Sequence, residues 1–224
     1  MATVAIENSD VAVAYDADVA AYRYDSDVTI AYDSSIVMGS TGSGKTTFIN
    51  MASNSTLRIG SGLKSCTNVV QIAQPFSFNG RMVTLIDTPG FDNTHKSQAE
   101  ILQMIAVFLA TAYENGKQLA GVIYMHRISD FKMSGTSTRN FKMFCQLCGD
   151  SALKNVVIAT NMWSGVSEDI GIAHEAELVS NDLFFKPLLD KGGKMLRHTN
   201  APASAHAIIA SIIENHPLPL QIQR

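Results

Sequence analysis

The chain contains 224 residues, of which 46% are hydrophobic and 17% are charged, and its formal net charge is −3. This composition is typical of a globular protein with a full hydrophobic core and excludes an intrinsically disordered chain. The slightly acidic balance does not provide the basic surface with which proteins bind nucleic acid, so we expect no nucleic-acid partner.

Cysteine usage indicates the cellular compartment, and the N-terminal residues and the apolar runs bear on secretion and membrane insertion. Cys66, Cys145 and Cys148 are too few for a disulfide framework, which favours a reducing compartment such as the cytoplasm. Four acidic residues interrupt the first twenty positions, so we expect no secretion signal. The longest apolar run, residues 101–113, is shorter than the roughly 20 residues of a membrane span, so we expect no transmembrane segment.

The first 33 residues repeat a short unit, seen as DVAVAYD, DVAAYRYD and DVTIAYD. A period of eight or nine residues is too short for a helical solenoid repeat, and no chemically active side chains gather there. We therefore expect residues 1–33 to form a weakly ordered extension and residues 34–224 to form a single domain.

From residue 34 onward, strand-like and helix-like segments alternate. Asn79-Gly80 predicts a tight antiparallel hairpin between two strand-like runs, and Ser97-Gln98-Ala99-Glu100 predicts a capping box at a helix start. Alternation of this kind predicts a three-layer α/β fold with a mainly parallel sheet and one antiparallel edge hairpin. The expected strands are 36–38, 69–78, 81–86, 121–125, 156–160 and 195–198, and the expected helices are 45–52, 97–114, 136–147, parts of 168–185, and 204–215.

A glycine-rich motif lies between the first expected strand and helix. Residues 39–46 match G-x-x-x-x-G-K-[ST], the phosphate-binding loop. Its glycines let backbone N–H groups face the phosphates, and the helix N-terminus adds its dipole. We expect Lys45 to reach the β- and γ-phosphates and Thr46 to bind Mg²⁺ through its hydroxyl. The predicted phosphate-binding residues are Gly39, Ser40, Thr41, Gly42, Ser43, Gly44, Lys45, Thr46 and Thr47.

Phosphate loops occur in kinases, ATPases and GTPases, and a second motif narrows the choice. Asp87 ends an apolar strand 42 residues after Lys45 (87 − 45 = 42), and we expect it to hold Mg²⁺ through water. Gly90, three residues later, is expected to contact the γ-phosphate through its N–H group. In the polar segment 60–67, Thr67 is the first candidate for a hydroxyl that binds Mg²⁺ when the γ-phosphate is present, and Ser65 is the second candidate. The alternative for Thr67 is an ordinary β-branched residue at a strand start.

The stretches GSTGSGKTTFIN, SGLKSCTNVV and LIDTPGFDNT resemble the septin-like GTPases, which include the immunity-associated (avirulence-induced) GTPases and the chloroplast import-receptor GTPases. Downstream stretches such as NVVIATNMW and LFFKPLLDKGGKMLRH look like those of uncharacterised fungal G-domain proteins in that group. The resemblance covers about residues 36–224. It implies a P-loop G domain, a guanine-nucleotide switch with slow hydrolysis, and nucleotide-dependent homodimers.

The end of the strand at 156–160 is where a GTPase reads the base. GTPases follow this strand with Asn or Thr, then Lys, any residue, and Asp, whereas this chain has Asn161-Met162-Trp163-Ser164. Loss of the aspartate, which accepts hydrogen bonds from guanine, predicts a weakened guanine preference. Trp163 is either a stacking partner for the base or a packed core residue, and Met162 is a candidate cover for one face of the base.

The hydrolytic machinery is less complete than the binding machinery. Phe91 stands after Gly90 in place of a glutamine that could orient water, which indicates slow hydrolysis. Arg127, after the fourth strand, is the candidate that assists hydrolysis, either in the same chain or across a dimer. Other polar candidates are Asp92, Asn93 and His95, and the predicted catalytic set is Lys45, Thr67, Gly90 and Arg127.

The predicted function is a switch that binds GTP or GDP with Mg²⁺ and hydrolyses GTP slowly. One alternative is a degenerate nucleotide-binding interaction module without turnover, favoured by Phe91 and Ser164. A second alternative is an ATP-using phosphate-loop enzyme, favoured only by the altered base motif.

Overall fold

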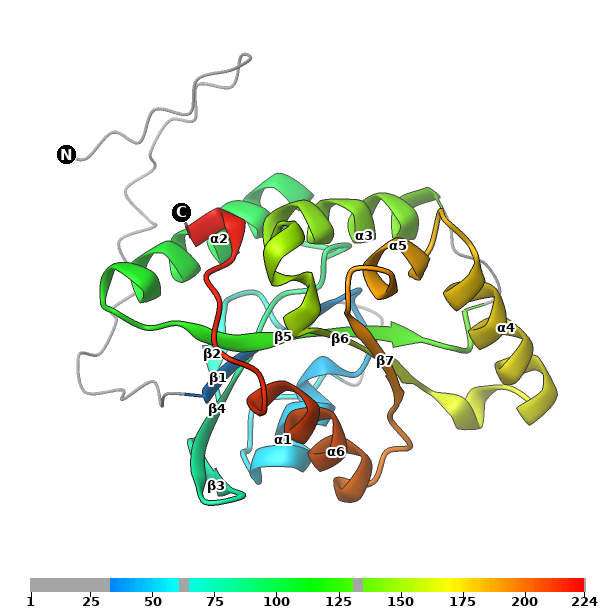
Figure 1. Cartoon of the computed structure of the whole chain (residues 1–224), viewed down its shortest axis with the longest axis horizontal. Helices are drawn as coiled ribbons and strands as arrows, with labels where there is room; N and C mark the ends of the chain where they lie inside the picture. Colours follow the sequence, from blue (N-terminus) through cyan, green and yellow to red (C-terminus); the bar gives the residue numbers. More distant parts are fainter. Residues whose placement is uncertain (1–32, 61–64, 131–134, 224) are drawn as a thin grey trace, which may run out of the picture.

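A central sheet lies between two layers of helices (Figure 1). The computed structural model describes residues 33–60, 65–130 and 135–223. The predicted extension at residues 1–33 lies outside the described residues apart from Asp33, which begins the first strand. Within the described ranges, no helix is both long and apolar enough to cross a membrane.

Among the described residues, the sheet has seven strands in the order β2-β4-β1-β5-β6-β7, with β3 also paired to β4. The pairs β1–β4, β1–β5, β5–β6 and β6–β7 are parallel, whereas β2 and β3 both run antiparallel to β4. The predicted fold class is therefore confirmed. The strands are β1 (Asp33–Gly39), β2 (Gln71–Ile72), β3 (Phe76–Phe78), β4 (Arg81–Asp87), β5 (Leu119–Arg127), β6 (Val156–Asn161) and β7 (Lys194–Arg197).

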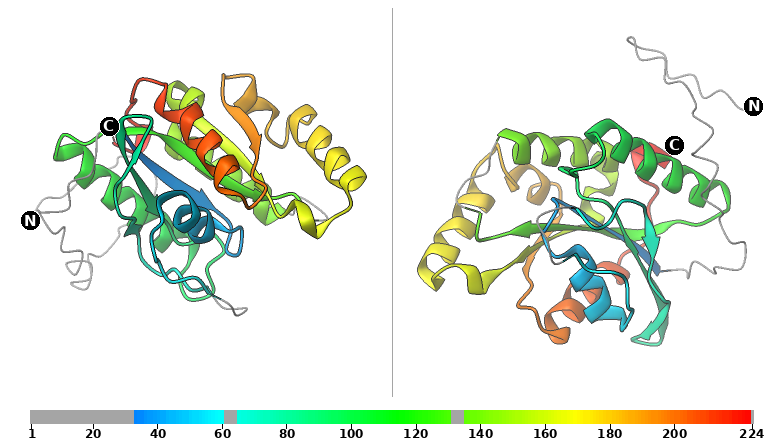
Figure 2. Two further views of the ribbon diagram at one scale, coloured as in Figure 1. Left: turned by 90° about the horizontal axis from the view of Figure 1, so that it is seen from below. Right: turned by 180° about the vertical axis from the view of Figure 1, so that it is seen from behind.

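Helices cover both faces of the sheet, as the two views in Figure 2 also show. One layer contains α2 (Gln98–Glu114), α3 (Gly135–Cys148) and the short α5 (Lys186–Leu189), and the other contains α1 (Lys45–Ser53) and α6 (Pro202–Ile213). Helix α4 (Glu168–Ser180) lies at one side of the molecule.

Strand β5 shows why the sheet is buried on both sides. Val122 and Tyr124 belong to the core cluster under α2 and α3, whereas Ile123 and Met125 belong to the cluster under α1 and α6. Successive side chains of a strand point to opposite faces, so a strand covered on both faces needs an unbroken apolar run. The runs in β1, β5 and β6 supply this pattern and place these three strands at the centre.

The edge hairpin forms as predicted, but the strand that enters it is broken. Asn79 and Gly80 both have positive φ, 50° and 74°, as a two-residue turn between antiparallel strands requires. The run expected at 69–78 is divided into β2 and β3, with Pro75 between them. Proline has no N–H to donate to a neighbouring strand, so it interrupts the pairing with β4.

The predicted capping box at the start of α2 is confirmed. The Ser97 side chain accepts a hydrogen bond from Glu100 N, and the Glu100 carboxylate accepts one from Ser97 N at 2.6 Å. The hydrogen bonds from Ser97 lower the pKa of Glu100.

Strand β5 is longer than the predicted 121–125, because it pairs with β6 as far as Arg127, opposite Asn161. Its extension brings Arg127 to the carboxyl edge of the sheet.

Candidate functional site

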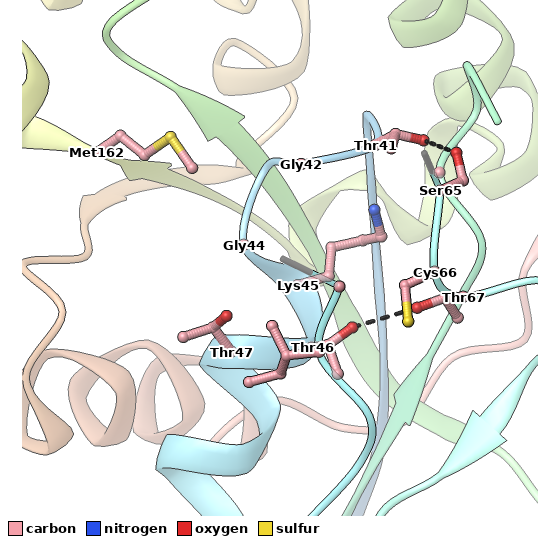
Figure 3. Close-up of a pocket in the computed structure, with 13 residues that line it drawn as sticks. Thr41, Gly42, Gly44, Lys45, Thr46, Thr47, Ser65, Cys66, Thr67 and Met162 are labelled. Atoms are coloured by element: carbon pink, nitrogen blue, oxygen red, sulfur yellow. Dashed lines mark hydrogen bonds between the residues drawn. The ribbon is translucent and has the colours of Figure 1, made fainter. Parts of the chain in front are cut away.

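The carboxyl ends of the parallel strands meet at a pocket built around the loop between β1 and α1 (Figure 3). Crevices at this edge of an open α/β sheet are the usual place for ligands. Most of the predicted phosphate-binding residues line the pocket, together with residues from segment 59–67, Gly90 and the end of β6. The lining residues are Thr41, Gly42, Gly44, Lys45, Thr46, Thr47, Ile59, Gly60, Ser65, Cys66, Thr67, Gly90 and Met162.

Two glycines of the loop have no room for a side chain. Gly39 has φ 140°, and a Cβ there would lie 2.4 Å from the carbonyl oxygen of Met125. Gly44 has φ 90°, and a Cβ there would lie 2.5 Å from Asn161 Nδ2. Gly44 is also the N-cap of α1, whose first N–H groups are free of intrahelical partners. The loop thus passes close to β5 and β6 and directs the start of α1 at the pocket, an arrangement suited to phosphate.

Lys45 is held inside the concave side of the loop. Its ammonium donates hydrogen bonds to the carbonyl oxygens of Gly39 at 3.1 Å and Ser40 at 2.8 Å. Burial lowers the pKa of Lys45 from 10.5 to about 8, while the nearby Asp87 charge acts in the opposite direction. A buried cation whose hydrogen-bond partners are the Gly39 and Ser40 carbonyl oxygens favours an anionic ligand in the pocket.

Three segments distant in the sequence bring oxygen atoms together below the loop. The Thr46 hydroxyl donates to Asp87 Oδ2 at 2.7 Å, and the Thr67 hydroxyl donates to the same oxygen at 3.4 Å. The Thr46 and Thr67 hydroxyl oxygens are 3.4 Å apart, as Figure 3 shows. Thr67, from segment 65–67, therefore lies beside the predicted metal residues of α1 and β4.

The Asp87 carboxylate fits a bound divalent cation. Its Oδ1 atom is buried and has no hydrogen-bond partner among the described residues. Burial raises the pKa of Asp87, while the hydrogen bond from Thr46 lowers it. No group of three or more His, Cys, Asp or Glu side chains that could hold a metal ion occurs in the part of the chain that the structure describes. Hydroxyls, one carboxylate and water are how proteins hold Mg²⁺ beside phosphates, whereas an all-protein cage is unusual for this ion.

The segment after β4 packs directly on the phosphate loop. A Cβ on Gly90 would lie 2.3 Å from Thr41 N, so no other residue fits there without displacing the loop. Phe91 is buried in the core under α2, and its N–H faces the carbonyl oxygen of Gly39 at 3.4 Å. The Thr41 hydroxyl is 3.2 Å from the Ser65 hydroxyl, which ties the loop to segment 65–67 as well.

The end of β6 is connected to the phosphate loop through Asn161. The Asn161 amide donates to Ser43 O at 3.1 Å, and its carbonyl oxygen accepts from Met162 N at 2.7 Å. Met162 has a left-handed backbone, φ 61°, and its side chain lines the pocket on the side of the loop opposite Ser65 and Thr67 (Figure 3). Met162 is therefore placed to cover a base, whereas Ser164 is exposed.

The structure favours the packing role for Trp163 over the predicted role in base stacking. Its indole N–H donates to Thr160 O at 3.1 Å, and the Arg197 guanidinium lies 4.1 Å from the ring centroid. A Cβ on Gly171 would lie 2.8 Å from the ring, so the indole packs tightly on α4. Trp163 is absent from the pocket lining because these contacts turn its ring toward α4 and β7.

Arg127 lies near the phosphate loop. Its Nη1 atom is 3.5 Å from the position that a Cβ on Gly42 would occupy, and its Nε atom is 3.0 Å from Asp130 Oδ1. The adjacent His126 is buried against Phe185, and burial lowers the pKa of His126 to about 4. Because His126 carries no charge near neutral pH, Arg127 is the cationic side chain that the end of β5 brings near the phosphate loop.

Sequence reasoning assigned no role to three of the residues that the structure places here, and it assigned a different role to a fourth, Asp92, as a candidate that assists hydrolysis. Ile59, Gly60 and Cys66 line the pocket, and Asp92 hydrogen bonds to the phosphate loop. The sequence placed Asp92 near the site because it follows Gly90 by two residues, but it gave no signal of the contact with Thr41.

Comparison with known proteins identifies the domain. Residues 34–160, more than half of the chain, match the family model described as a 50S ribosome-binding GTPase. The chain belongs to this GTPase family. The GTPase is a P-loop GTP-binding switch, and the matched region contains the phosphate loop, Thr67, Asp87, Gly90 and Arg127. No curated protein matches the chain.

Solved structures of GTPases share the fold at low sequence identity. Toc33 from Arabidopsis thaliana in complex with Mg²⁺ and GMPPNP has a TM-score of 0.62 and 14% identity, covering 81% of this chain and 85% of that one. Toc33 with GDP and Mg²⁺ has a TM-score of 0.63 and 14% identity, covering 84% and 88%. NFeoB from S. thermophilus, bound to GDP·AlF4⁻ and K⁺, has a TM-score of 0.51 and 13% identity, covering 82% and 62%. At these identities the likeness shows the fold alone.

Proposed function

We propose that the GTPase binds GTP and GDP together with Mg²⁺ and hydrolyses GTP slowly, changing the conformation of the segments around Thr67 and Gly90. The observation that carries the proposal is the convergence of Thr46, Thr67 and the buried Asp87 carboxylate below the phosphate loop. The ligands named for the Toc33 structures, GDP or GMPPNP with Mg²⁺, support it.

Each residue of the site has a role that follows from its position. The N–H groups at the start of α1 and the Lys45 ammonium hold the phosphates, and Gly90 offers its N–H to the γ-phosphate. Thr46 and Thr67 present their hydroxyls, and Asp87 orients water around the metal. The Mg²⁺ ion, when bound, neutralises phosphate charge and strengthens nucleotide binding.

Slow hydrolysis follows from Phe91. Its side chain is 3% exposed and packs in the core, so it neither faces the pocket nor offers a polar group to water. Arg127 is the remaining candidate to stabilise charge that develops on the phosphates during hydrolysis. Its distance from Gly42 supports this role in the same chain, and its partly exposed side chain is also compatible with action across a dimer.

Replacing Arg127 with alanine is expected to lower the GTP hydrolysis rate by about tenfold, because a charge-stabilising donor is lost. GDP affinity is expected to stay unchanged, since Lys45 and the loop remain. Arg139→Ala on the exposed face of α3 is the matched control. Single-turnover phosphate release, measured over a range of protein concentrations, also tests a homodimer, because a rate per molecule that rises with concentration requires a second copy. Equal rates for Arg127→Ala and the natural protein at every concentration would exclude the role.

The base preference is tested by competition against a fluorescent GDP in the presence of Mg²⁺. GDP is expected to displace the probe better than ADP by about tenfold or more, about 1.4 kcal/mol. Ser164→Asp is expected to widen this preference, because a carboxylate accepts charge-assisted hydrogen bonds from guanine. Equal competition by GDP and ADP in both proteins would contradict guanine recognition and favour an ATP-using enzyme.

We place the protein, more finely, among the septin-like GTPases, with relatives among fungal G-domain proteins, and we assign residues 34–224 to one G domain. The motifs GSTGSGKTTFIN and LIDTPGFDNT support this placement. Nucleotide-dependent homodimerisation is part of the same proposal, and for atToc33 and psToc159 dimerisation is described as important for GTPase activity. The three free cysteines support a location in a reducing compartment such as the cytoplasm.

A further inference from the structure

The carboxylate of Asp92 binds the phosphate loop. It accepts a hydrogen bond from the backbone N–H of Thr41, the third residue of the loop. The residue as a whole is exposed. After burial and Asp87, the Asp92 charge is the next influence on the pKa of Lys45, which it raises. An anionic side chain of the protein thus occupies an N–H group of a loop whose amides bind phosphate.

The backbone delivers Asp92 to this position. Gly90 lies against Thr41 with no space for a Cβ, and Phe91 is anchored in the core. Because both preceding residues are fixed, the backbone holds the Asp92 side chain close to the loop. The same packing brings Gly90, whose N–H is expected to contact a γ-phosphate, next to Thr41, the residue that Asp92 contacts.

The residues after Asp92 bind the segment that carries Thr67. The Asn93 side-chain amide donates to Thr67 O at 3.0 Å. Thr94 and Ser65 form a reciprocal pair, in which Ser65 N donates to Thr94 Oγ1 at 3.1 Å and Thr94 N donates to Ser65 Oγ at 3.0 Å. Asn93 and Thr94, which follow Asp92 directly in the chain, thus connect it to the segment around Thr67.

We propose that Asp92 competes with the γ-phosphate of GTP for the phosphate loop and sets the preference of the protein for GDP over GTP. A carboxylate and a γ-phosphate are both anions and both accept hydrogen bonds, so they repel each other when they share the Thr41 and Gly90 side of the loop. GDP ends one phosphate earlier and leaves the Asp92 contact in place. This inference rests on the proposed function, and it adds the residue that distinguishes the two nucleotide states.

The test compares GDP with GMPPNP, a GTP analogue that resists hydrolysis, as competitors of fluorescent GDP in the presence of Mg²⁺. Asp92→Asn keeps the shape of the side chain and removes its charge, and Asp92→Ala removes the contact as well. Both variants are expected to bind GMPPNP about tenfold more tightly than the natural protein, while GDP affinity stays within about twofold. Asp169→Asn, on exposed α4, removes the same charge away from the site and is expected to change neither affinity.

The outcomes separate this inference from the function on which it rests. If the natural protein binds neither GDP nor GMPPNP, the proposed function is wrong. If all proteins bind GDP and the ratio of GMPPNP to GDP affinity is the same in natural protein, Asp92→Asn and Asp92→Ala, the competition is excluded while the function stands. An unchanged ratio with slower single-turnover hydrolysis would also overturn it, since Asp92 would then act on the attacking water.

Discussion

Replacing Lys45 with alanine is expected to weaken GDP binding on the order of 100-fold, about 3 kcal/mol. The Lys45 ammonium is buried inside the loop and hydrogen bonded to Gly39 O and Ser40 O, so no mobile surface cation can take its place. Titration calorimetry with GDP in the presence of Mg²⁺ measures the loss. The variant is expected to remain folded, because the removed charge was costly to bury and the loop keeps its glycines.

Lys142→Ala is the matched control for Lys45→Ala, since Lys142 is an exposed lysine on α3. It removes the same charge from the molecule and is expected to leave GDP affinity unchanged. A Lys45→Ala variant that binds GDP as tightly as the Lys142→Ala variant would show that the nucleotide phosphates do not lie in this loop.

Replacing Asp87 with asparagine is expected to remove the Mg²⁺ dependence of nucleotide binding. The substitution preserves size, so it should preserve the packing of β4, but it removes the buried charge that faces Thr46 and Thr67. A group that orients the water around a bound metal typically contributes about 10-fold to 100-fold in metal affinity. GDP affinity is therefore expected to fall by about tenfold or more on chelation of Mg²⁺ in the natural protein, and to change by less than about threefold in Asp87→Asn.

The control for Asp87→Asn is Asp150→Asn, which removes a charge from an exposed surface ion pair with Lys191. Its Mg²⁺ dependence is expected to match that of the natural protein. An equal loss of affinity on chelation in Asp87→Asn and Asp150→Asn would mean that Asp87 is a structural carboxylate and that the metal is held elsewhere.

Local sequence signals specified the framework of this protein because their physical causes are local. Two residues that adopt positive φ, Asn79 and Gly80, are enough to make a hairpin turn, and the Ser97–Glu100 pair satisfies the first N–H groups of a helix without help from the rest of the chain. The phosphate loop is predictable for the same reason, since its glycines serve a backbone conformation. The order of these elements along the chain predicts both the fold class and the GTPase family.

Side-chain orientation at the edges of these elements depended on distant parts of the chain. Trp163 could have faced a base or the core, and its contacts with Gly171 and Arg197, which lie on α4 and β7, decided for packing. Pro75 divided one expected strand into β2 and β3, because a residue without an N–H interrupts the pairing of that strand with β4.

The sequence by itself determined the P-loop class of the protein, the order of its strands and helices, and the residue types available to bind phosphate and metal. Only the tertiary structure decided which of these residues meet. Thr67 reaches Asp87, Arg127 approaches Gly42, and Asp92 binds Thr41, in each case across at least twenty residues of sequence. Parallel strands and their crossover helices bring such residues to one edge, and no local signal in the sequence records the distance between them.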